Sequence, residues 1–190
     1  MADRQRDSAA IARLGLYRTY RQSGTQAWLE TRGTSMRPLV RAGSRMLVDF
    51  GAQPSGVGQV VVFEHGDGIV AHRIVGQRQR DGSEELILKG DAEPFFDRPI
   101  APADVLGIVR GIRPPGSGPV RQRGFDGPSS RLIARVSRWS GRGARVARRV
   151  AARTPSPIRG PALRAIPTIA RVPTRLIVAP LIHDPGAGRR

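Results

Sequence analysis

The chain has 190 residues and a formal net charge of +17; 39% of its residues are hydrophobic but only 5% are aromatic. This length suits one domain with an appendage, or at most two small domains, with a core made largely of Val, Ile and Leu. The absence of cysteine excludes disulfides, thiolate metal sites and a catalytic cysteine. From Val120 onward there are 16 arginines against two acidic residues. Such a segment seeks an anionic partner, whether phospholipid, nucleic acid or an acidic protein.

Residues 1–24 form a basic N-terminal segment for which we predict a short helix over 8–21. Ser8 is a candidate N-cap and Gly24 follows the helix end. The N-terminus is too charged and the apolar stretch after it too short for a secretory signal. No run of the chain approaches the ~18–20 apolar residues needed to cross a bilayer. We therefore expect a cytoplasmic protein, with peripheral attachment to a membrane left open.

Residues 25–112 predict a mainly β domain, coiled or sandwich-like, because short apolar runs alternate with Gly- and Asp-containing turns. The expected extended segments cover residues 28–30, 44–50, 59–64, 69–75, 85–89 and 105–112. Turns at 65–68 and 80–83 indicate hairpins. An acidic, proline-containing loop over 90–102 separates the last two strands.

The composition changes after residue 112. Residues 113–128 are rich in Pro and Gly and predict a linker. Residues 129–190 predict a basic tail, helical over 129–153 and irregular beyond, with Gly141 and Gly143 expected to break the helix.

In that helix four arginines would form one stripe and four apolar residues would share the other side: Arg131, Arg135, Arg138 and Arg142, against Leu132, Ile133, Val136 and Trp139. This pattern is typical of a helix on an anionic membrane surface. A helix packed on its own domain, with its arginines in solvent, is an equal alternative.

The candidate chemistry begins in the segment Gly33-Thr34-Ser35-Met36-Arg37-Pro38, where glycine and proline place the Ser35 hydroxyl on a bent backbone. An ordinary polar turn is the alternative. His72 lies in an apolar strand, where a lone histidine is more often structural. Asp91 and Asp97 follow the next strand, and a carboxylate there could orient His72. Otherwise Asp91 caps a turn and Asp97 forms an exposed salt bridge. We expect His65 and His183 to be solvated.

The Ser35 segment, then His72-Arg73-Ile74-Val75, then Lys89-Gly90-Asp91 with Asp97, together resemble the type I signal peptidases. They are most similar to the archaeal and endoplasmic-reticulum branch, in which a histidine replaces the catalytic lysine of the bacterial enzymes and the repressor autoproteases. The resemblance covers roughly residues 31–112. The only lysine, Lys89, stands at a strand end and not at the base position, which favours a Ser–His pair.

The resemblance implies a signal-peptidase-like coiled β-sheet and a role for each matched residue. Ser35 would be the nucleophile, His72 the general base and Asp97 the partner that orients His72, with Asp91 supporting the site. The candidate substrate-binding residues are Gly33, Thr34, Met36 and Pro38. The family cleaves extended peptides, docked against a strand edge, after small residues. We expect no cofactor and no metal.

The chain also departs from the family. Members usually carry an N-terminal transmembrane anchor, whereas only a short apolar stretch, 11–17, occurs here. Some members have a hydroxyl at the position of Gly33, and the Arg-rich tail has no counterpart that we can assign. An intracellular peptidase that processes one dedicated precursor is more consistent with the missing anchor than a signal peptidase of the secretory pathway.

A different class of function stays open. The chain could be a catalytically silent domain of the same fold, attached through its basic tail to an anionic membrane or to nucleic acid. Lipid is favoured over nucleic acid, because the tail lacks interleaved aromatics and a helix-turn-helix. A self-cleaving repressor has little support, since both a DNA-binding domain and the catalytic lysine are missing.

Overall fold

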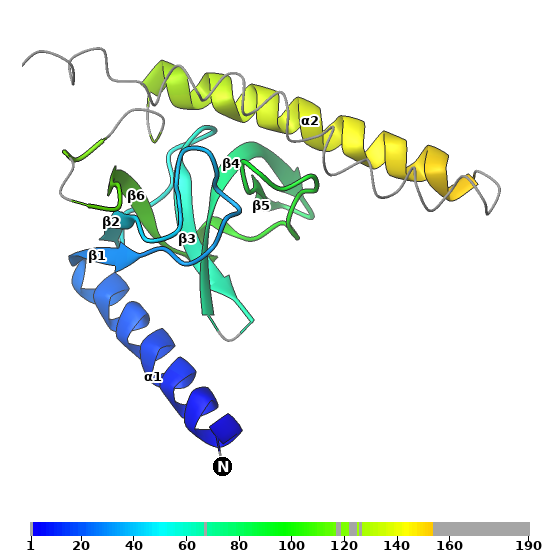
Figure 1. Cartoon of the computed structure of the whole chain (residues 1–190). Helices are drawn as coiled ribbons and strands as arrows, with labels where there is room; N and C mark the ends of the chain where they lie inside the picture. Colours follow the sequence, from blue (N-terminus) through cyan, green and yellow to red (C-terminus); the bar gives the residue numbers. More distant parts are fainter. Residues whose placement is uncertain (1, 67, 117–118, 122–124, 126, 154–190) are drawn as a thin grey trace, which may run out of the picture.

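The computed structural model describes residues 2–66, 68–116, 119–121, 125 and 127–153. The irregular tail predicted beyond residue 153, with His183, lies outside the described residues. Six strands form one antiparallel sheet in the order β1-β2-β6-β3-β4-β5 (Figure 1). They are β1 Gln26–Glu30, β2 Arg45–Phe50, β3 Val60–His65, β4 Gly68–Arg80, β5 Ser83–Lys89 and β6 Val105–Arg113. The mainly β fold class is confirmed.

Two hairpins bring the site-bearing strands together. In the first, β3 and β4 pair as far as His65 opposite Gly68. In the second, Arg80 pairs with Ser83, and Asp81 and Gly82 between them have φ values of 50° and 79°. Two consecutive left-handed residues match the right-handed twist of the flanking strands. This second hairpin extends β4 beyond its predicted end at residue 75.

The centre of the sheet is buried on both faces. Along β3, Val60 and Val62 belong to one apolar cluster, whereas Val61 and Phe63 belong to another. Alternation with a period of two places these pairs on opposite faces of the strand. The first cluster also contains Met36 and neighbouring residues from the segment between β1 and β2. The core therefore anchors the turn that carries Ser35.

Helix α1 (Ala2–Ser23) is longer than the predicted 8–21, and Ser8 lies inside it rather than at its start. The Tyr17 ring stacks on Phe50 with centroids 5.9 Å apart, and Arg18 forms a 2.7 Å ion pair with Glu64. Figure 1 shows the N-terminal part of α1 projecting away from the sheet. Among the described residues, no helix is long and apolar enough to cross a membrane.

Helix α2 (Gly127–Arg153) runs through Gly141 and Gly143 without interruption, so the prediction of a break there was wrong. Packing compensates for the low helix propensity of glycine. An added Cβ at Gly141 would lie 2.7 Å from the ring of Phe96, so glycine is what lets the helix approach this loop. In Figure 1, α2 lies along one side of the sheet domain, against β4 and β5, and α1 leaves the opposite end.

Candidate active site

The segment between β1 and β2 holds Ser35 on a fixed backbone. The Thr31 hydroxyl donates to the Arg41 carbonyl at 2.7 Å, and the Val40 amide donates to the Met36 carbonyl at 2.9 Å. Ser35 itself is half-buried, and its carbonyl accepts a 2.7 Å hydrogen bond from the Ala92 amide. The Ser35 backbone is therefore tied to the loop that follows β5.

His72 lies in β4 with only 6% of its surface exposed. Its Nδ1 atom lies 2.7 Å from Oδ2 of Asp97, and the Asp97 amide donates to the Leu88 carbonyl at 3.0 Å. The other ring nitrogen, Nε2, is buried and has no hydrogen-bond partner among the described residues. A proton on Nδ1 that is donated to Asp97 leaves the Nε2 lone pair free to accept another proton.

Gly90 is where the Ser35 segment and the His72 ring meet. A Cβ added at Gly90 would lie 2.8 Å from the Ser35 carbonyl oxygen and 3.0 Å from His72 Nε2. The missing side chain is what allows these two elements to approach. The hydrogen bond between the Ser35 hydroxyl and His72 Nε2 is not formed in this structure. Catalytic hydrogen bonds are often long without substrate and shorten when it binds.

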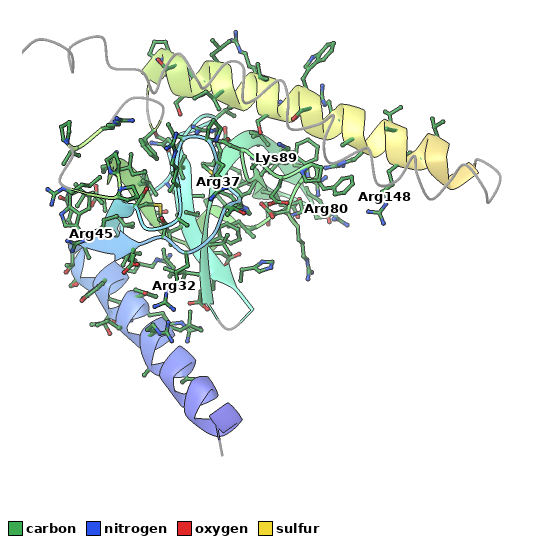
Figure 2. All side chains as sticks on the ribbon, viewed as in Figure 1. Arg32, Arg37, Arg45, Arg80, Lys89 and Arg148 are labelled. Carbon is green, nitrogen blue, oxygen red and sulfur yellow. The ribbon has the colours of Figure 1, made fainter. Side chains whose placement is uncertain are left out.

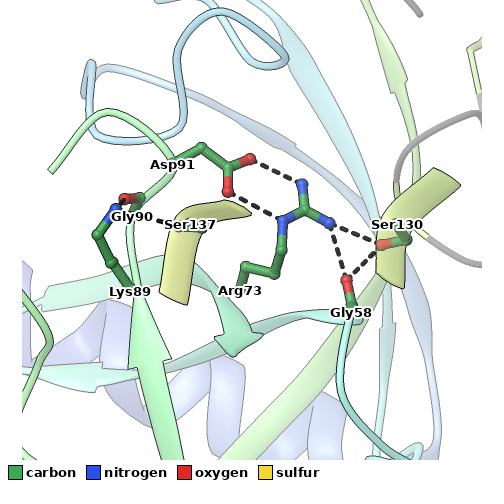
Figure 3. Close-up of polar contacts among 7 residues, drawn as sticks. All are labelled: Gly58, Arg73, Lys89, Gly90, Asp91, Ser130 and Ser137. Carbon is green, nitrogen blue, oxygen red and sulfur yellow. Dashed lines mark hydrogen bonds and ion pairs between the residues drawn. The ribbon is translucent and has the colours of Figure 1, made fainter. Parts of the chain in front are cut away.

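Asp91 lies in a buried ion pair rather than against His72. Its two carboxylate oxygens accept hydrogen bonds from Arg73 Nε at 2.9 Å and Nη2 at 2.7 Å, and both side chains are fully buried (Figure 3). The same guanidinium donates to the Gly58 carbonyl and to the Ser130 hydroxyl of α2. Because Arg73 follows His72 in β4, this pair fixes the Gly90–Asp91 backbone beside the histidine.

Lys89 is also buried and is directed toward α2. Its Nζ donates to the Ser137 hydroxyl at 3.0 Å and to the Gly90 carbonyl at 3.3 Å (Figure 3). Burial lowers the pKa of Lys89 to about 8, although the carboxylates of Asp91, Glu93 and Asp97 raise it in part. Lys89 thus joins the Gly90 loop to α2.

A groove of about 420 Å³ opens beside Ser35. Its lining comes from α1, from the end of β1 and the three residues that follow it (29–33), and from residues 68–71 of β4. Of the candidate substrate-binding residues, Gly33 and Met36 line the groove, whereas Thr34 and Pro38 do not. Thr34 is exposed, and Pro38 follows a cis peptide bond.

Three parts of the site were missed by reasoning from the sequence. One is the contribution of α1 to the groove through Arg13, Leu14 and Tyr17. Figure 2 shows Arg32, another lining residue, near α1. The other two are the Arg73–Asp91 pair and the serines of α2. Arg73 carried a signal, because an arginine inside an apolar strand needs an acidic partner.

The remaining histidine of the sheet, His65, is exposed at the end of β3, as predicted. Within the part of the chain that the structure describes, no group of three His, Asp or Glu side chains is arranged to hold a metal ion. Ser35, His72 and Asp97 offer a hydroxyl, an imidazole and a carboxylate. No family model matches the chain, and neither does any curated protein or solved structure.

Proposed function

We propose that the protein is a serine endopeptidase of the signal-peptidase type that cleaves an extended precursor or signal-like peptide after small residues. One observation carries the proposal. His72 is held by Asp97 at Nδ1. Its buried Nε2 has no hydrogen-bond partner in the described part of the chain and lies beside Gly90, where the Ser35 backbone also approaches. Buried polar atoms are mostly hydrogen-bonded, so a buried ring nitrogen that faces the Ser35 segment supports a functional role for His72.

In the proposed reaction His72 Nε2 accepts the Ser35 hydroxyl proton as Oγ attacks the scissile carbonyl carbon. The Ser35 amide donates to the developing oxyanion, and Asp97 stabilises the imidazolium. His72 then gives its proton to the leaving amine. Water attacks the acyl-enzyme in the second half, with His72 again as base, and regenerates the Ser35 hydroxyl.

The groove supplies a route for the substrate. β1 is an edge strand of the sheet, and the groove runs between the segment that follows it and the start of β4. An extended peptide can add to such an edge through main-chain hydrogen bonds. Met36, buried beneath the turn, would close the pocket and favour small side chains next to the cleaved bond.

A second candidate is a catalytically silent domain that binds a partner. The observation in its favour is that the Ser35 hydroxyl is not hydrogen-bonded to His72. The two candidates differ in one measurable property, which is whether a peptide bond is cleaved.

The test compares the N-termini of all proteins in cells that carry the wild-type protein, Ser35→Ala or Ser55→Ala. Ser55 is an exposed serine in the loop between β2 and β3 and serves as the control. We expect N-termini that occur with wild type and Ser55→Ala but disappear with Ser35→Ala. Identical sets in all three strains would exclude the peptidase and leave the binding domain.

A further inference from the structure

Helix α2 has a buried side made mostly of small residues. Six positions at spacings of three and four face the sheet domain and are buried: Ser130, Ile133, Ala134, Ser137, Gly141 and Ala144. Such spacings return to one face of a helix. Ile133 therefore turns inward, although the sequence grouped it with Leu132 and Trp139. The apolar side predicted from the sequence is divided between the core and the solvent.

The opposite side of α2 exposes large apolar residues. Leu132, Trp139 and Val146 follow one another at steps of seven, and Val150 lies four residues further on. Their exposed fractions are 49%, 80%, 59% and 62%. Steps of seven and four bring these side chains into one row. A tryptophan exposed to this degree is unusual, because its large ring strongly favours removal from water.

Positive charge accompanies the apolar row. α2 contains eight arginines and no acidic residue. Arg131, Arg135, Arg142 and Arg149 are exposed and, by their helical spacing, run along one flank of the row. Among the described residues, no ion pair involves a residue of α2. An apolar row flanked by uncompensated arginines matches the boundary between lipid chains and anionic headgroups.

We infer that this exposed side of α2, defined by Leu132, Trp139, Val146 and Val150 with the flanking arginines, docks on an anionic lipid surface. Charge disfavours a second copy of the same side, since the four flanking arginines of one copy would face those of the other. A nucleic-acid duplex would satisfy the arginines but leave the Leu, Trp and Val row without an apolar counterpart. An anionic bilayer surface offers the apolar row its acyl chains and the arginines its headgroups.

The docked helix would also lie next to the candidate active site. On its buried side, Gly141 contacts the Phe96 ring, and the Arg145 guanidinium lies 4.2 Å from the centre of that ring. Phe96 directly precedes Asp97. The inference stands on α2 alone and does not depend on the proposed peptidase activity.

The test uses the full chain with Trp28→Phe, which leaves Trp139 as the only tryptophan. Vesicles of phosphatidylglycerol should shift its fluorescence to the blue, and brominated lipid should quench it. Vesicles of phosphatidylcholine should do neither at the same salt. High salt should weaken the binding, because exposed charges are screened. Ser35→Ala should bind as the parent does.

A pair of charge variants separates this surface from general basicity. Arg135→Glu with Arg142→Glu should weaken binding to phosphatidylglycerol vesicles by roughly thirtyfold or more, since each arginine near an anionic surface contributes about fivefold. The control, Arg45→Glu with Arg80→Glu, changes the net charge equally at exposed positions on β2 and β4. Trp139→Ala should also weaken the binding.

Four results would overturn the inference. Trp139 fluorescence could remain unchanged with phosphatidylglycerol, or both charge pairs could reduce binding equally. Trp139 fluorescence could also shift to the blue without lipid as the protein concentration rises. Finally, it could shift on addition of duplex RNA or DNA but not of vesicles. The last result would assign the surface to another partner.

Discussion

The carboxylate of Asp97 lies 2.7 Å from Nδ1 of His72 and leaves the other ring nitrogen, Nε2, facing Gly90. Asp97→Asn keeps the size of the side chain but offers an amide in place of the negative charge. We expect kcat to fall by roughly two to four orders of magnitude, because the histidine loses the partner that selects its tautomer and stabilises its cation.

Steady-state kinetics on the processed substrate, together with a thermal unfolding curve, would check this result. Asp49→Asn is the matched control, since Asp49 pairs with Arg110 at a partly exposed position on β2. Equal losses in the two variants would contradict a specific role for Asp97.

Gly90→Ala should inactivate the protein and destabilise it by about 1–3 kcal/mol, the usual cost of overpacking a buried site. The new Cβ would lie 2.8 Å from the Ser35 carbonyl and 3.0 Å from His72 Nε2, so the Ser35 segment or the ring must move. A displacement near 1 Å costs about two orders of magnitude in rate. Gly15→Ala provides the comparison, because no atom lies within 4 Å of its added Cβ. Wild-type activity in Gly90→Ala would show that this approach is unimportant.

Asp91→Ala should destabilise the fold far more than the loss of a surface ion pair. It leaves the Arg73 guanidinium charged and fully buried, which costs about 3–5 kcal/mol. Asp49→Ala breaks the more exposed pair with Arg110 and should cost less than about 1 kcal/mol. Urea unfolding of both variants measures the difference. Similar midpoints would mean that Asp91 does not hold the buried network.

Lys89 predicts a pH dependence of stability. Its pKa is about 8 in the native protein against 10.5 ordinarily, so the cost of burying its charge is fully present below pH 8. Between pH 8 and 10.5 the native protein has released a proton that the unfolded chain still holds. The free energy of unfolding therefore rises with pH in this window.

Lys89→Met should lack this rise, which amounts to at most roughly 3 kcal/mol. Chemical denaturation of both proteins at several pH values between 7 and 11 would measure it. Subtracting the free energy of unfolding of Lys89→Met from that of the wild type at each pH removes the contribution of groups that titrate alike in both proteins. Parallel curves for the two proteins would disprove the lowered pKa.

Local patterns were enough to predict the strands and both hairpins. The apolar runs and Gly/Asp turns act within a few residues, and the Asp81–Gly82 pair defines its turn on its own. His72 and Asp97 were predicted as partners only through the family resemblance, and their 2.7 Å contact agrees with that expectation. By contrast, the helix through Gly141 depends on Phe96, 45 positions earlier, and no local pattern contains that contact.

The partner of Asp91 shows the same limit. Residue patterns alone do not indicate whether Asp91 or Asp97 contacts His72, or that the other aspartate pairs with Arg73. Pairing of Arg73 with Lys89 across β4 and β5 places Asp91 next to the guanidinium. Ser130 completes that network from α2, 57 positions along the chain.

The Pro- and Gly-rich segment 113–128 was predicted to be a linker, yet Phe125 within it is 1% exposed and belongs to the main apolar cluster. Beyond it, Ser130 and Ser137 accept hydrogen bonds from the buried Arg73 and Lys89. Cutting the chain at this segment would leave two cations inside the protein with fewer acceptors. The sheet and α2 should therefore melt as one cooperative unit, and the smallest stable fragment with an intact site must extend past Ser137.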